Sequence, residues 1–118
     1  MFEAANVRDW IWMPIVDPSG DKIGTMESIY YDTASDLPAF ATVTAGLLGR
    51  SKLLFVPLDG ATVSPKHLTV QYDKKVAKDA PSIDTDGELQ STDEAAIYRH
   101  YNLLYTQGPG GERKLGRR

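Results

Sequence analysis

An acidic segment, residues 82–93, carries the side chains of this sequence best suited to bind a metal ion. Five of its residues fall at the ligating or turning positions 1, 3, 5, 6 and 12 of a calcium loop: Ser82, Asp84, Asp86, Gly87 and Asp93. Position 1 is Ser where Asp is usual, and position 12 is Asp where a bidentate Glu is usual. The alternative is an Asx-type surface turn leading into a capped helix. We expect no cofactor and keep Asp84, Asp86 and Asp93 as a metal-responsive alternative.

Other catalytic chemistry has little support in the sequence. The chain contains no cysteine, which excludes thiolate nucleophiles, cysteine zinc sites and disulfides. His67 and His100 lie on different predicted elements, and a transition-metal site needs histidines to converge with a carboxylate. No nucleophile-elbow pattern occurs, and residues 46–50 lack the spacing and the Lys-Ser/Thr pair of a phosphate-binding loop. We therefore expect no enzyme activity.

A binding role is indicated by large apolar residues in places where they would be exposed. Leu47 and Leu48 lie in a loop with a glycine on each side. Trp10 and Trp12 lie near the N-terminus. Leu54 and Val56 belong to a segment that is apolar on both faces. Exposed aromatic and apolar clusters mark protein interfaces. The alternatives are that both tryptophans cover an open barrel end and that residues 52–57 form a central strand.

The charge distribution argues against a nucleic-acid groove over the whole domain. The chain has a net charge of −3, but residues 107–118 carry four basic residues against one acidic residue, so +3 lies there and −6 on the rest. An acidic body disfavours DNA binding. The basic tail leaves RNA or ribosome association open as an alternative. No window approaches 18 uninterrupted apolar residues and no signal-peptide pattern begins the chain, so we expect a cytoplasmic protein without a membrane span.

Turn signals and short apolar runs predict a strand-rich first part. Residues 17–20 (Asp-Pro-Ser-Gly) form a turn between two strands. In residues 22–32 the apolar spacing 23, 26, 29 breaks strict alternation, which predicts a bulge, with Gly24 as a suitable place. Two further strands are predicted over residues 39–45 and 52–57, and a hairpin over residues 61–72.

The second part of the chain has a different pattern. Asp73 is expected to cap one or two helical turns that end before Pro81. A polar connector follows. Ser91 and Glu94 have the spacing of a capping box, which predicts an amphipathic helix to about Leu104.

Three segments together resemble the PRC-barrel family: residues 17–32, with the turn and an Ile-Gly pair, residues 38–44, and residues 55–58, where Pro57 leaves the strand. Residues 79–81 and 84–89, with the helix, resemble the extension of stand-alone actinobacterial-type members. The resemblance implies a barrel like the cytoplasmic domain of the photosynthetic reaction centre H subunit and the C-terminal domain of the ribosome maturation factor. Both relatives work by contacting other proteins, and no catalytic residues carry over.

These observations predict a mainly β fold: a small PRC-type β-barrel of five to six strands with a C-terminal amphipathic helix. Residues 1–75 form the barrel, residues 76–104 the connector and a helix packed on the barrel, and residues 105–118 a disordered basic tail. The predicted function is a non-catalytic protein–protein adaptor with an unidentified partner protein, and self-association into a homo-oligomer is a variant of the same role. The metal-responsive module and the ribosome- or RNA-associated factor are the alternatives.

Overall fold

The computed structural model describes residues 10–33, 35–47, 50–84, 89, 91–103 and 115–117. The first strands of this part are β1 (Pro14–Val16), β2 (Lys22–Asp32), β3 (Pro38–Leu47), β4 (Arg50–Pro57), β5 (Thr62–Val63) and β6 (Leu68–Thr69). Then come helix α1 (Lys74–Lys78), β7 (Ser82–Asp84), helix α2 (Ser91–His100) and β8 (Leu115–Arg117). The mainly β fold with a C-terminal helix is therefore confirmed.

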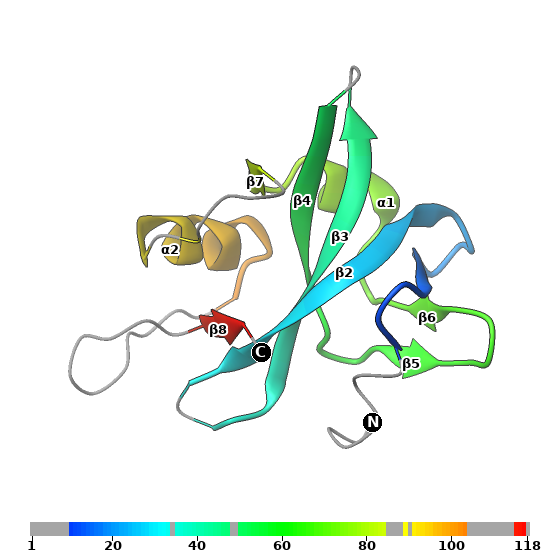
Figure 1. Ribbon diagram of the computed structural model, residues 1–118, viewed down its shortest axis with the longest axis horizontal. Coiled ribbons are helices and arrows are strands. Elements are labelled where there is room, and N and C mark those ends of the chain that lie inside the picture. Colours follow the sequence, from blue (N-terminus) through cyan, green and yellow to red (C-terminus); the bar gives the residue numbers. More distant parts are fainter. Residues whose placement is uncertain are drawn as a thin grey trace.

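All eight strands of the described ranges belong to one sheet, in the order β5-β6-β1-β2-β3-β4-β7, and β8 pairs with β2. The β1–β6 pair is parallel and the other pairs are antiparallel. The strand count exceeds the five or six predicted, because β7 and β8 come from segments that the sequence indicated as connector and tail. The sheet twists strongly through β2, β3 and β4 without closing on itself between β5 and β7 in the part described (Figure 1).

The long strand β2 bends as its apolar spacing predicts. Its buried residues include Ile23, Met26 and Ile29. The register of β2 shifts at two places: with β1 between Lys22 and Gly24, next to the predicted Gly24, and with β3 between Met26 and Ser28. Gly24 is needed for another reason, because a Cβ there would lie 2.4 Å from the carbonyl oxygen of Thr44 on β3. Only glycine allows the two backbones to approach so closely.

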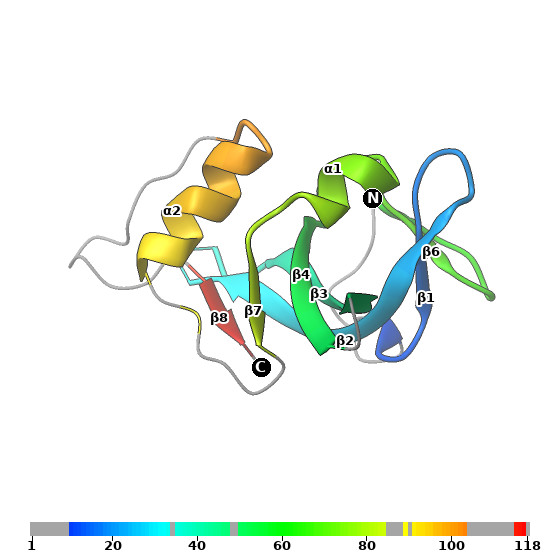
Figure 2. The same ribbon diagram turned by 90° about the horizontal axis from the view of Figure 1, so that it is seen from above.

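The sheet separates two apolar clusters. The first holds Trp10, residues of β1 and β2, Val56 and Ala77 of α1; the second holds Phe40, Phe55 and side chains of α2. Val56 and its neighbour Phe55 point into different clusters because successive strand residues face opposite sides. Figure 2 shows α2 and β8 at one end of the sheet and β1 and β6 at the other. Of the two readings of residues 52–57, the central strand is the one observed, because β4 pairs with β3 and β7 and its side chains are buried on both faces.

Helix α2 packs on the sheet of its own chain. The rings of Tyr98 and Phe40 meet edge to face at 5.2 Å. The helix ends at His100, earlier than the predicted Leu104, because Asn102 takes the left-handed conformation with φ 59°. The N–H of Leu103 then donates to the Tyr98 carbonyl at 2.8 Å and that of Asn102 to the Arg99 carbonyl at 3.0 Å, which is a Schellman cap.

Two stretches differ from their predicted state. Residues 82–84, predicted as connector, form β7 and pair with residues 52–54 of β4. Residues 115–117, predicted as part of a disordered tail, form β8 and pair with residues 30–32 of β2. Each strand has three residues, too few for a recognisable alternation in the sequence, so the sheet edge that receives them determines their conformation.

Candidate functional site

The two tryptophans near the N-terminus have opposite environments. Trp10 is 3% exposed and lies in the first cluster, so it is a core residue and presents no surface to a partner. Trp12 is 68% exposed, the largest exposed fraction among the exposed large apolar side chains of the described residues. Its backbone is in the left-handed region with φ 74°. Of the two predicted interaction residues, Trp12 is therefore the one that a second molecule can reach.

The predicted contact residues on the strands are differently placed. Leu54 is 1% exposed and Val56 0%, so both lie in the interior of this chain because β4 is covered on both faces. Leu47 is the last residue of β3. The Leu47 side chain and Leu48 lie outside the described residues, so the contact predicted for this loop stays a prediction. The structure brings none of these residues together with Trp12 in a single described surface.

The metal alternative is only partly placed. Asp84 ends strand β7 and Asp93 lies in the first turn of α2, while Asp86 lies outside the described residues. His67 closes the β5–β6 turn, and Nε2 of His100 lies 2.7 Å from the Val76 carbonyl oxygen. Within the described ranges, no three His, Cys, Asp or Glu side chains gather closely enough to hold a metal ion. The metal-responsive module stays a prediction.

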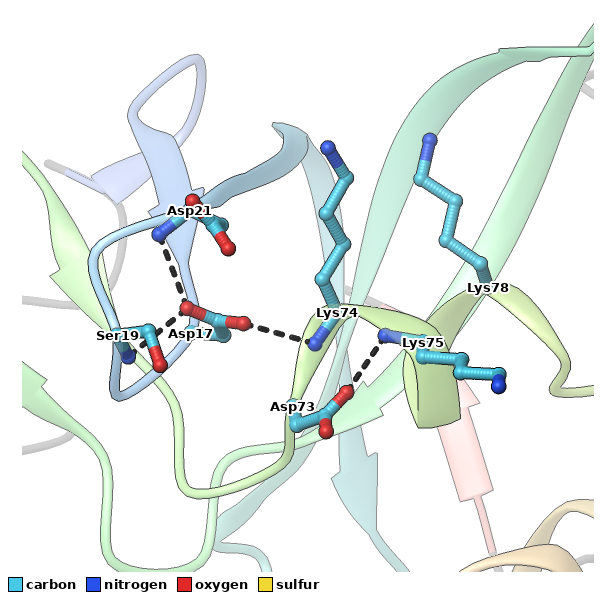
Figure 3. Close-up of a pocket in the computed structure, with 7 residues that line it drawn as sticks. All are labelled: Asp17, Ser19, Asp21, Asp73, Lys74, Lys75 and Lys78. Carbon is cyan, nitrogen blue, oxygen red and sulfur yellow. Dashed lines mark hydrogen bonds between the residues drawn. The ribbon is translucent and has the colours of Figure 1, made fainter.

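A polar surface pocket of about 440 Å³ lies between the β1–β2 turn and α1. Its lining residues are Asp17, Ser19, Asp21, Asp73, Lys74, Lys75 and Lys78. Figure 3 shows the side chains of Lys74 and Lys78 extending in the same direction from α1, while that of Lys75 points elsewhere. The Asp-Pro-Ser-Gly turn and the Asp73 cap were both predicted from the sequence, but their convergence on one pocket was not.

Asp17 is the centre of this pocket, and its carboxylate is committed to main-chain groups. One oxygen accepts from the N–H groups of Ser19 and Asp21 at 2.9 Å each, and the other accepts from the N–H of Lys74 at 3.0 Å (Figure 3). The Lys74 N–H is the largest cause that holds the pKa of Asp17 below its ordinary value. The other two N–H groups and the Lys74 charge act in the same direction, and burial opposes them. Asp17 thus joins the turn to α1 and is not positioned to act as a base.

The other buried polar groups of the described part also have structural partners. Thr42 and Ser28 are hydrogen-bonded through their hydroxyls across β2 and β3. Glu94, 0% exposed, accepts the N–H of Leu115 at 3.0 Å. The capping-box pattern predicted a local role for Glu94 and gave no sign of its link to β8, because nothing in the sequence pairs residue 94 with residue 115.

No helix in the described part of the chain is both long and apolar enough to cross a membrane.

Comparison with known proteins identifies the family to which this fold belongs. The search of curated proteins gives no match. The family model described as the PRC-barrel domain matches residues 2–77, which span β1 to β6 and most of α1. Because this match covers more than half of the 118 residues, the chain belongs to the PRC-barrel domain family.

Proposed function

We propose that this chain is a non-catalytic docking module that binds a partner protein through a surface centred on Trp12. The observation that carries the proposal is the combination of a largely exposed indole with a left-handed backbone at the same residue. The partner offers an apolar pocket that receives the indole. Tryptophan is among the residues most enriched at the energetic centres of protein interfaces.

The backbone around Trp12 supports a presenting role. A left-handed conformation costs a residue with a side chain about 1–2 kcal/mol, and such strain persists where the surroundings fix it, often at functional positions. Here the N–H of Trp12 donates to the Met26 carbonyl at 2.8 Å, and the N–H of Met13 donates to the Trp10 carbonyl at 2.9 Å. Trp10 anchors the turn in the core. The exposed ring is therefore attached to a fixed backbone, which reduces the entropy lost on binding.

The non-catalytic part of the proposal is supported by the use of the buried polar groups. Apart from the aromatic residues, Asp17, Thr42 and Glu94 are the buried polar side chains in the described ranges, and each forms a hydrogen bond within the chain. A catalytic group needs a polar atom directed at a substrate. The cytoplasmic location predicted from the sequence stays a prediction.

The experiment compares three versions of the full tagged chain as bait in lysate of the native host: wild type, Trp12→Ser and Leu37→Ser. Leu37 is the matched control because it is also apolar and 58% exposed. We expect one protein whose recovery falls at least tenfold with Trp12→Ser and is unchanged with Leu37→Ser. Titration of that purified protein should then shift the Trp12 emission to the blue.

Equal recovery by the wild type and by Trp12→Ser would overturn the assignment of Trp12. Sedimentation equilibrium of the wild type tests whether a second copy of this chain, in place of another protein, covers the surface around Trp12. A dimer that Trp12→Ser dissociates would mean that a second copy of the chain, and not another protein, covers the indole.

A further inference from the structure

The C-terminal strand β8 occupies an edge of β2 from outside the region matched by the family model. Strand β1 pairs with residues 22–25 of β2 and β8 pairs with residues 30–32, so two segments distant in sequence share one side of the strand. In Figure 1, β8 lies beside the far end of β2, close to α2 and away from β1. The family match ends at residue 77, whereas β8 begins at Leu115.

The site that β8 occupies, called its seat here, is formed by residues 30–32 of β2, by Glu94 and by the second apolar cluster. Leu115 is 2% exposed and belongs to the aromatic cluster that includes Tyr30, Phe40 and Tyr98. Its N–H donates to the fully buried carboxylate of Glu94 at 3.0 Å. A segment that fits this seat therefore needs three features. It needs a large aliphatic side chain for the aromatic cluster, a main-chain N–H that donates to the Glu94 carboxylate, and an extended backbone that pairs with β2.

Charge complementarity indicates what kind of segment fits. The sequence around the strand is basic, with Arg113, Lys114, Arg117 and Arg118. The elements that form the seat are acidic: Asp32 stands opposite Leu115 in the ladder, and Asp93 and Glu94 lie in the first turn of α2. Long-range attraction between these charges favours a basic segment over an acidic one.

We propose that this edge of β2 is a docking site for an extended, basic segment of a partner protein that carries a leucine-like residue, and that β8 occupies the site in cis and gates it. Strand addition to a sheet edge is a common mode of peptide recognition. A tethered occupant acts at an effective concentration in the millimolar range, so it suppresses binding in trans until it is released. The site is separate from Trp12, and the proposal does not rest on the docking function proposed above.

The shortness of β8 makes exchange feasible. Its ladder with β2 has three residue pairs, compared with eight for the β3–β4 ladder. Segments with few hydrogen bonds open locally at a lower free energy than the global unfolding of the domain. Release leaves the β3–β4 ladder and the first cluster intact, because β8 contributes to neither.

The test uses the full chain and a fluorescent peptide of residues 111–118 as probe, with binding followed by anisotropy. We expect the wild type to bind weakly and Leu115→Asp, which places a charge in the aromatic seat, to release β8 and bind at least tenfold more tightly. Val63→Asp, which adds the same charge at an exposed position of β5 at the other end of the sheet, is the control and should bind as the wild type does. A peptide with Asp at position 115 should not bind, and adding Glu94→Ala to Leu115→Asp should abolish the gain.

A folded Leu115→Asp chain that binds the peptide no better than the wild type overturns the proposal, and so does equal binding of the Asp-containing peptide. If Leu115→Asp does not unfold cooperatively, hydrogen exchange of the wild type decides: millimolar peptide must slow exchange of residues 30–32, and unchanged exchange rejects the site. A wild-type dimer that Leu115→Asp dissociates would replace the partner segment by a second copy. Trp12 is unaltered throughout, so these outcomes leave the test of the docking function separate.

Discussion

The hydroxyl of Tyr101 donates a hydrogen bond to the main-chain carbonyl of Phe55, with 2.6 Å between the oxygens and 46 residues between the two positions. Both side chains are buried in the second cluster. Burial is the main reason that the pKa of the Tyr101 phenol is raised, and the charge on Tyr72 contributes. The hydroxyl therefore stays protonated and holds the end of α2 to the middle of β4.

Tyr101→Phe should lower the free energy of unfolding by about 1–3 kcal/mol, because it leaves the buried Phe55 carbonyl without this donor while the ring still fills its place. Urea unfolding followed by circular dichroism measures the change. Tyr72→Phe is the control, because the Tyr72 ring packs against Tyr101 with 4.9 Å between the ring centroids. We expect the loss of the Tyr72 hydroxyl to lower the free energy of unfolding by less than the loss of the Tyr101 hydroxyl does. Equal midpoints for Tyr101→Phe and wild type would contradict the prediction.

Gly24→Ala should lower the free energy of unfolding by about 1–3 kcal/mol, as overpacking does in a close contact. The added Cβ would lie 2.4 Å from both the Thr44 carbonyl oxygen and Cγ1 of Val43, and the carbonyl belongs to the β2–β3 ladder. Gly116→Ala is the matched control, because its Cβ would meet only Cγ2 of Thr33 at an ordinary 3.5 Å. Thermal unfolding compares the two, and a larger loss for Gly116→Ala would reject this account of Gly24.

Asp17→Asn should destabilise the protein at neutral pH and progressively less in acid. The folded pKa of Asp17 lies below its ordinary value of 3.8, chiefly because the Lys74 N–H donates to the carboxylate. The stabilisation is therefore present above the unfolded-state pKa and is lost as the pH falls through the folded pKa. Urea midpoints of wild type and variant, followed from neutral pH into acid below the folded pKa, should converge.

Ser19→Ala provides the control for that series, since it leaves the Ser19 N–H in place and removes no titrating group. Its difference from the wild type should be constant with pH. A gap between wild type and Asp17→Asn that does not narrow in acid would show that the carboxylate contributes through shape and not through charge.

The sequence predicted the elements whose local pattern is strong. The Asp-Pro-Ser-Gly turn, the bent strand with buried residues at 23, 26 and 29, and the Asp73 cap depend on neighbours close in sequence. Strands β7 and β8 depend instead on distant partners, residues 52–54 and 30–32. No local signal marks a three-residue strand, because its hydrogen-bond partner decides its conformation.

The candidate site shows the same limit. Apolar residue types identified Trp10, Trp12, Leu54 and Val56, but type does not show which side chains the rest of the chain covers. Only Trp12 of these four is exposed, whereas Trp10, two residues earlier, lies in the core. The Glu94–Leu115 contact could not be anticipated from the sequence, since it requires knowledge that β8 lies against α2.

The contrast between Trp10 and Trp12 predicts two separable fluorescence signals. Trp12→Phe should leave one buried indole with blue-shifted emission that iodide quenches poorly, because Trp10 is 3% exposed. Trp10→Phe should leave emission that is red-shifted and readily quenched, because Trp12 is 68% exposed. Stability should divide in the same way: Trp10→Ala should cost about 3–5 kcal/mol as a large core truncation, and Trp12→Phe less than about 0.5 kcal/mol as a surface change. Strong iodide quenching in Trp12→Phe would place Trp10 outside the core, and it would also remove the anchor on which the fixed presentation of Trp12 depends.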